Sequence, residues 1–251
     1  MHRLIVHNLI CLLKGHALGL PATDGEPDGE AAPIAPMSPH KWRTLNYVAE
    51  TLGIAPYIAE PPAPFPEYDV NDAQLFNHWT NKRYMQLRDD EMASDTLSED
   101  TLRLLDIIVM NADHIITHDV DIKGIVALGL HIQHHKGTID YEKLNYWLSR
   151  IGIIQLASFE GNMLVSALGF NADDIPFLVR RSKSRDKQAR HNFLRCIDKA
   201  LEKHSFSMSA SVSIHDDLPS PLSPQNATMP GSRTLGCAST LFTESSAFTY
   251  W

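Results

Sequence analysis

The feature that most constrains the fold is a succession of helical segments between residues 98 and 169. The segments begin after residues whose side-chain oxygens cap free backbone amides, namely Ser98, Asp121 and Asp140. The later segments end before a glycine, which readily takes the left-handed conformation that terminates helices, at Gly137, Gly152 and Gly169. Apolar residues recur at helical spacing, and strand-like alternation is poor. The pattern predicts helices packed on helices with short connections.

The first third of the chain predicts two helices joined by a proline-rich connection. Residues 2–20 form the first, weakened near its end by Gly15 and Gly19. Residues 21–37 are rich in proline, glycine and acidic residues and predict a linker. Ser38 and Pro39 then suit the cap and the first position of a helix. We expect its apolar stripe to face the core and Gly53 to end it; the stripe is Trp42, Leu45, Val48, Ala49 and Leu52.

A second linker near residues 60–68 precedes two further helices. Asp69 or Asn71 caps the first, which runs to about Met92. Its predicted inward side chains are Ala73, Phe76, Trp79 and Leu87. The second, from residue 101 to about 118, is apolar on most sides and is therefore expected at the centre of the protein.

These segments predict an all-α fold, an irregular helical bundle of about six to eight helices over residues 1–204. Residues 205–251 are rich in serine and proline, which predicts a largely disordered C-terminal tail. Within that tail, the serine alternation at 205–214 marks a candidate strand.

Composition narrows the possible partners and the compartment. The 251 residues are 43% hydrophobic and carry a formal net charge of -8. An acidic chain does not favour nucleic acid or an anionic membrane, because both require a positive surface. Three widely spaced cysteines without a C-x-x-C pair favour a reducing, cytoplasmic location; they are Cys11, Cys196 and Cys237. No cofactor is expected, and the expected partner is an unidentified protein.

The stretch MNADHIITHDVDIKG, residues 110–124, holds the main candidate for metal chemistry. His114 and His118 are four residues apart and so share one helix face, a spacing that can hold a divalent ion. Asp119 can add an oxygen ligand, so the candidate metal ligands are His114, His118 and Asp119. The interpretation that we favour is that these histidines finish one helix, where a protonated imidazole suits the helix dipole, and that Asp121 caps the next.

The pair His118-Asp119 also supports an enzymatic alternative. THDVDIKG loosely resembles the motif of HD-domain phosphohydrolases, in which a His-Asp pair of an all-helical fold holds the metal that activates water. The resemblance implies an earlier histidine and a later aspartate. His78, and either Asp173 or Asp174, occupy the matching order along the chain.

Two blocks resemble the helical segments of the bacterial uncharacterised nucleotidyltransferase family. MSPHKWRTLNYVAETLGIAPYIAE resembles its N-terminal helices, and residues 106–153 resemble its C-terminal helices in the same order. The resemblance implies a helical scaffold. The family's catalytic sheet has no counterpart in the roughly 40 residues between the blocks, and Asp119 and Asp121 form a D-x-D triplet only between helices. No catalytic residue therefore carries over.

The sequence thus predicts a non-catalytic helical interaction protein as the leading hypothesis. The metal-dependent phosphohydrolase built on His118 and Asp119 is the alternative. A basic stretch, residues 180–190, is read as a solvated helix start that offsets the acidic chain. A weaker hypothesis is that this stretch contacts a nucleotide.

Overall fold

The computed structural model describes residues 2–20, 34–59, 65–94, 97–179 and 182–213, and this part of the chain is helical without strands. The predicted all-α fold is therefore confirmed. The elements are α1 (Arg3–Leu12), the π-helix η1 (Leu13–Ala17), α2 (Pro39–Thr51), α3 (Ala55–Ile58), α4 (His78–Met92), α5 (Glu99–Thr117), α6 (Ile122–His134), α7 (Tyr141–Ile151), α8 (Ile154–Leu168), the 3-10 helix η2 (Ala172–Asp174) and α9 (Lys183–Ser213).

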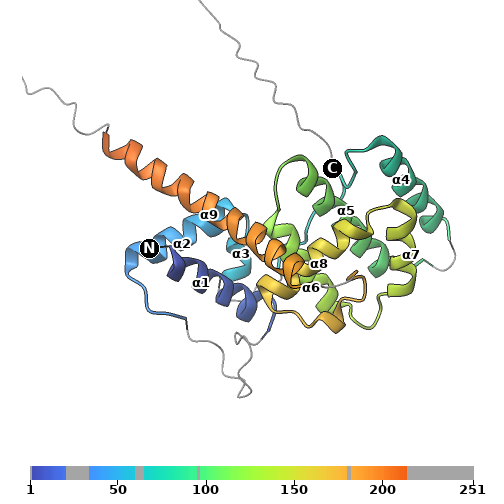
Figure 1. The fold of residues 1–251 in the computed structure, drawn as a ribbon, viewed down its shortest axis with the longest axis horizontal. Coiled ribbons are helices and arrows are strands. Elements are labelled where there is room, and N and C mark those ends of the chain that lie inside the picture. Colours follow the sequence, from blue (N-terminus) through green and yellow to red (C-terminus); the bar gives the residue numbers. More distant parts are fainter. Residues whose placement is uncertain (1, 21–33, 60–64, 95–96, 180–181, 214–251) are drawn as a thin grey trace, which may run out of the picture.

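The helices form a central group, and further helices pack at each of its two ends. Helices α5, α6 and α8 pack on one another, and α7 packs against both α5 and α8. Helix α4 covers α7 at one end of the molecule, whereas α1, α2 and α3 lie at the other (Figure 1). The long α9 contacts α8 extensively and continues along α2, so it connects the central group to the helices at that end.

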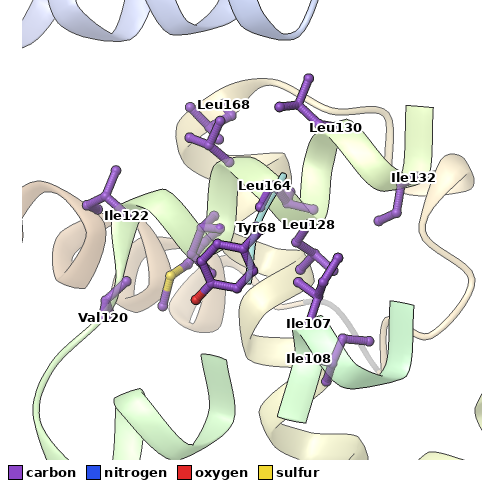
Figure 2. Close-up of a cluster of buried hydrophobic side chains, with 14 of the residues drawn as sticks. Tyr68, Ile107, Ile108, Val120, Ile122, Leu128, Leu130, Ile132, Leu164 and Leu168 are labelled. Atoms are coloured by element: carbon purple, nitrogen blue, oxygen red, sulfur yellow. The ribbon is translucent and has the colours of Figure 1, made fainter. Parts of the chain in front are cut away.

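The core is centred on α5 and α6, as the apolar character of residues 101–118 predicts. Leu104, Leu105 and Ile108 of α5 are fully buried. Figure 2 shows Ile107 and Ile108 beside Leu128, with Tyr68 reaching into the same cluster. Gly129 permits close packing of α6, because a Cβ atom there would lie 2.7 Å from Cζ of Phe170.

Most predicted helix boundaries are confirmed by their capping bonds. The Asp121 carboxylate accepts a hydrogen bond from the Lys123 amide at 3.0 Å, and Asp140 accepts one from Lys143 at 2.9 Å. Gly152 and Gly169 close α7 and α8 with left-handed backbones, φ 93° and 77°. Ser98 precedes α5 as predicted, but its hydroxyl lies 2.6 Å from Thr101 Oγ1 and makes no bond to a helix amide.

The first helix differs from its prediction as a single helix over residues 2–20. Regular α-helix stops at Leu12, and the π-turn η1 follows, with the Leu18 amide bonded to the Leu13 carbonyl at 3.1 Å. Lys14 is buried in this wider turn. The Asn8 side chain bonds both backbone polar groups of Ala35, so the end of the first linker returns to α1.

The predicted start of the 69–92 helix is wrong. Of its four predicted inward side chains, Ala73 and Leu87 are buried as expected, but the other two are not. Helix α4 begins at His78 and is capped by Asn77, which accepts bonds from the Trp79 and Thr80 amides. Phe76 and Trp79, predicted inward, are 76% and 69% exposed. The preceding residues 68–75 contribute to the core without forming a helix; their buried side chains are Tyr68, Val70, Ala73 and Leu75.

The C-terminal strand prediction is also wrong within the described residues. Residues 205–213 continue α9, whose backbone hydrogen bonds leave no strand there. Residues 214–251 of the predicted tail, and residues 21–33 and 60–64 of the two predicted linkers, lie outside the described residues. None of the described helices has the length and apolar character that crossing a membrane requires.

Candidate functional site

The structure places the three predicted metal ligands around the end of α5. His114 lies in the last turns of α5, with Nδ1 3.6 Å from Oδ2 of Asp121. The His118 residue is the C-cap of the helix, and its ring centroid is 6.0 Å from that of His114. Nδ1 of His118 lies 2.6 Å from the Thr117 hydroxyl oxygen. The two imidazoles are therefore neighbours on one helix end, as the four-residue spacing predicts.

Asp119 contacts α9 through its carboxylate. Arg195 donates to Oδ1 at 3.2 Å, the Lys199 ammonium bonds Oδ2, and the Cys196 thiol lies 3.5 Å from Oδ1. Burial alone would raise the pKa of Asp119, but these bonds and that from the Val120 amide outweigh it and lower the pKa to about 2. Asp119 is thus a charged tie between the α5–α6 turn and α9.

Other residues of the phosphohydrolase hypothesis lie on separate elements. His78 opens α4, and Asp173 and Asp174 belong to η2, where Asp174 pairs with Lys136. Among the residues that the structure describes, no group of three or more His, Cys, Asp or Glu side chains is arranged to hold a metal ion. The metal site at His114, His118 and Asp119 stays a prediction, which metal titration can test.

Asp121 belongs to a polar network that sequence reasoning missed. Besides capping α6, its Oδ2 accepts a hydrogen bond from the Tyr68 hydroxyl at 3.0 Å. The same hydroxyl lies 3.4 Å from Oδ1 of Asn111, and the Asn111 amide donates to Oε2 of Glu160 at 3.2 Å. His114 meets this network at Asp121. The polar network therefore extends from the exposed end of α5 to the middle of α8.

Glu160 is the least solvated member of this network. It is fully buried, and its Oε1 has no hydrogen-bond partner among the described residues. Burial raises the pKa of Glu160 well above its ordinary value, with only a partial opposing effect of the Asn111 amide. The folded protein therefore holds this carboxyl preferentially in its neutral form. A glutamate inside the apolar run of residues 153–168 is the signal that could have identified it.

A large cavity lies between α4, α5, α6 and the segment before Val70. Its volume is about 760 Å³, and we call it the central cavity. One side carries the aromatic residues Tyr57, Phe65 and Tyr68, and apolar side chains from three helices extend this surface. Met92 and Leu97 also line it, although they are 61% and 41% exposed. A volume of this size is typical of sites that receive a ligand or an anchoring side chain.

A buried carboxylate stiffens the wall of the central cavity. The Tyr84 hydroxyl donates to Oδ1 of Asp106 at 2.6 Å, and Arg88 lies 3.7 Å from Oδ2. Burial raises the pKa of Asp106, while the Tyr84 bond and Arg88 oppose the shift. These contacts connect α4 to α5 and hold the wall in one arrangement.

Three histidines of α6 and its C-terminal turn form one edge of the cavity. His131 donates from Nε2 to the Asp100 carbonyl at 2.7 Å, and Nδ1 of His135 lies 2.8 Å from Oδ1 of Asp100. The His131 and His135 rings stack with centroids 4.5 Å apart. Burial lowers the pKa of His131, although the carbonyl bond opposes the shift. The third member, His134, is the last residue of α6.

Comparisons with known proteins add no assignment. No family model, no curated protein and no solved structure matches this chain.

Proposed function

We propose that this protein is a non-catalytic helical interaction module whose central cavity receives an apolar anchor from a partner protein. The observation that carries the proposal is the presence of two exposed apolar side chains, Met92 and Leu97, in the lining of a 760 Å³ cavity. Exposed apolar surface at a concave site is typical of partner interfaces. Methionine suits such a surface, because its flexible thioether adapts to different partners.

The charges of the lining define the partner further. Carboxylates outnumber guanidinium groups by two in the central cavity; they are Glu67, Glu99, Asp100 and Asp106, against Arg88 and Arg103. Both arginines already have acidic partners, since Arg103 pairs with Glu67 at 2.9 Å and Arg88 faces Asp106. An apolar anchor flanked by lysine or arginine therefore complements this site better than an acidic segment.

The phosphohydrolase alternative makes a different demand on the same fold. Asp119 would have to exchange Arg195 and Lys199 for a metal ion. The tie to α9 would be lost in that exchange, which is a cost that the interaction module does not incur.

The resemblance to nucleotidyltransferase helices supports a scaffold role only. The two blocks correspond to α2 with α3 and to α5 through α7; of these elements, α3, α5 and α6 contribute side chains to the central cavity. We infer that the chain shares this kind of helical scaffold and uses it for binding.

A displayed library of random peptides tests the proposal directly. Peptides selected on the full chain should share an aromatic or aliphatic anchor next to lysine or arginine. Met92→Glu combined with Leu97→Glu should weaken their binding by about tenfold or more, because a charged side chain replaces each apolar contact. Ile116→Glu is the matched control, since Ile116 is 54% exposed and does not line the cavity. Equal binding by all three proteins would overturn the proposal.

A further inference from the structure

A second cavity, of about 490 Å³, lies between α1, η1, α8 and α9. It shares no lining residue with the central cavity. We call it the basic cavity and define it by Arg3, Val6, Lys14, Ala167, Arg190 and Leu194. His2, the N-cap of α1, and His7 of α1 also line it.

The lining of the basic cavity is mainly apolar inside, apart from the buried Lys14, and charged outside. Ala167 and Cys11 are buried, and Val6, Ile10 and Leu194 are half-buried. The outer lining consists of exposed, mostly basic residues, namely His2, Arg3, His7, Arg190 and Asp198. A molecule bound in the basic cavity therefore contacts mainly apolar side chains in the interior and positively charged side chains at the mouth.

Positive charge is concentrated in the basic cavity, although the chain as a whole is acidic. Arg3, Lys14 and Arg190 line the cavity together with a single carboxylate, that of Asp198, although the chain carries a net charge of -8. Within the described ranges, neither Arg3 nor Arg190 makes an ion pair. A guanidinium group has the planar donor geometry that binds carboxylate or phosphate in pairs of hydrogen bonds.

The interior cation is held in place by the fold. Lys14 is buried in the π-turn η1, and its Nζ would lie 3.2 Å from a Cβ atom at Gly169, the C-cap of α8. A cation at the C-terminal end of a helix is stabilised by the helix dipole. Glycine is required here both for its left-handed backbone and for this close approach. Lys14 therefore has a fixed place in the lining of the basic cavity.

We propose that the basic cavity binds a small amphipathic anion. Its apolar chain lies against Val6, Ile10 and Leu194, and Arg3 and Arg190 hold its carboxylate or phosphate. A nucleic acid would not use this site, because the apolar interior offers nothing to a hydrated backbone and the rest of the chain repels it. The same ligand chemistry is available from a free fatty carboxylate and from an anionic lipid.

Calorimetric titration of the full chain with octanoate, octanol and octylamine tests the charge requirement. We expect octanoate to bind, octylamine not to bind, and octanol to bind at least tenfold more weakly than octanoate. The combined variant Arg3→Gln and Arg190→Gln should weaken octanoate binding by at least about tenfold, a loss of about 1.4 kcal/mol. Arg185→Gln is the matched control, because Arg185 is exposed on the same helix but does not line the cavity.

A second variant tests the volume requirement. Ser166→Phe places a ring in the cavity from α8 and should abolish octanoate binding, while the far-ultraviolet circular dichroism of the helices is unchanged. Octanoate and octylamine binding with equal affinity, or octanoate affinity unaffected by the double arginine substitution, would overturn the proposal whether or not the phenylalanine variant folds. These outcomes are independent of the peptide selection on the central cavity.

Vesicles separate the two sources of the ligand. Co-sedimentation with phosphatidylglycerol vesicles that depends on Arg3 and Arg190 would identify a membrane lipid as the source of the anion. Octanoate binding without co-sedimentation would identify a free amphiphile. Vesicle binding that is independent of both arginines, in the absence of octanoate binding, would contradict the site.

Discussion

Asp119 accepts a hydrogen bond from the Arg195 guanidinium at 3.2 Å, although the two residues are 76 positions apart in the chain. Lys199, one turn further along α9, binds the other carboxylate oxygen. This contact fastens the α5–α6 turn to the helix that connects the two ends of the molecule. Asp119, which the sequence predicts as a candidate metal ligand, thus holds the α5–α6 turn against α9.

We expect Asp119→Asn to lower the free energy of unfolding by about 1 kcal/mol near neutral pH, because two partly exposed ion pairs are lost. The lowered pKa means that this stabilisation is complete above the unfolded value of 3.8 and is lost as pH falls through about 2. Urea unfolding of both proteins should therefore show a smaller difference at about pH 3 than at neutral pH. Glu202→Gln, an exposed change on α9, is the control; a difference that grew in acid would contradict the assignment.

Metal titration decides between the interaction module and the phosphohydrolase. We expect Zn²⁺ and Mn²⁺ to leave the melting temperature of the full chain unchanged, because Asp119 is engaged by α9. A ligand that binds the folded state would raise that temperature. A rise that disappears in His118→Ala but persists in His78→Ala would favour a metal site at the end of α5.

Glu160→Gln should change the pH dependence of stability. The raised pKa means that folded Glu160 keeps its proton while the unfolded chain releases it near 4.5. The wild-type protein therefore loses stability as pH rises from about that value toward the folded pKa. The neutral amide has no such loss, so the variant should gain stability relative to wild type as pH rises above about 5. A constant difference in chemical denaturation across this range would show that Glu160 does not titrate differently in the two states.

Gly124→Ala should destabilise the protein by about 1–3 kcal/mol, the usual cost of overpacking. A Cβ atom there would lie 1.9 Å from Oδ1 of Asn111 and 2.7 Å from the Tyr68 hydroxyl, and both groups are already hydrogen-bonded. Gly15→Ala is the control, because no atom lies within 4 Å of its added methyl group. Equal unfolding free energies for the two variants would mean that the network around Asn111 repacks freely.

The exposed position of Trp79, the second residue of α4, can be tested by truncating its side chain. We expect Trp79→Ala to change the unfolding free energy by less than about 0.5 kcal/mol, since its side chain faces water. Trp147→Ala should cost about 3–5 kcal/mol, because Trp147 is only 4% exposed in the core. Thermal or chemical unfolding measures both, and a large cost at Trp79 would restore the inward orientation that its sequence pattern predicts.

The sequence patterns gave wrong predictions where packing between distant segments outweighed the periodicity of a single segment. Phe76 and Trp79 fit the apolar stripe of a helix. In the structure, however, Tyr68 and Leu75 are buried in the core, and Phe76 and Trp79 are exposed. Residues 205–213 alternate like a strand, but they continue a helix whose earlier turns already pack on α8. A strand at that point would have no neighbouring strand to bond with in the described part of the chain.

The sequence by itself determined the helical class and most helix ends, because a cap such as Asp140 and a stop such as Gly152 act through bonds to residues within one turn. Only the tertiary structure decided that Asp119 meets Arg195, that Glu160 is reached through Asn111, and where the two cavities lie. These relationships join residues far apart in the chain, and their energies depend on burial and charge that exist only once the helices have packed.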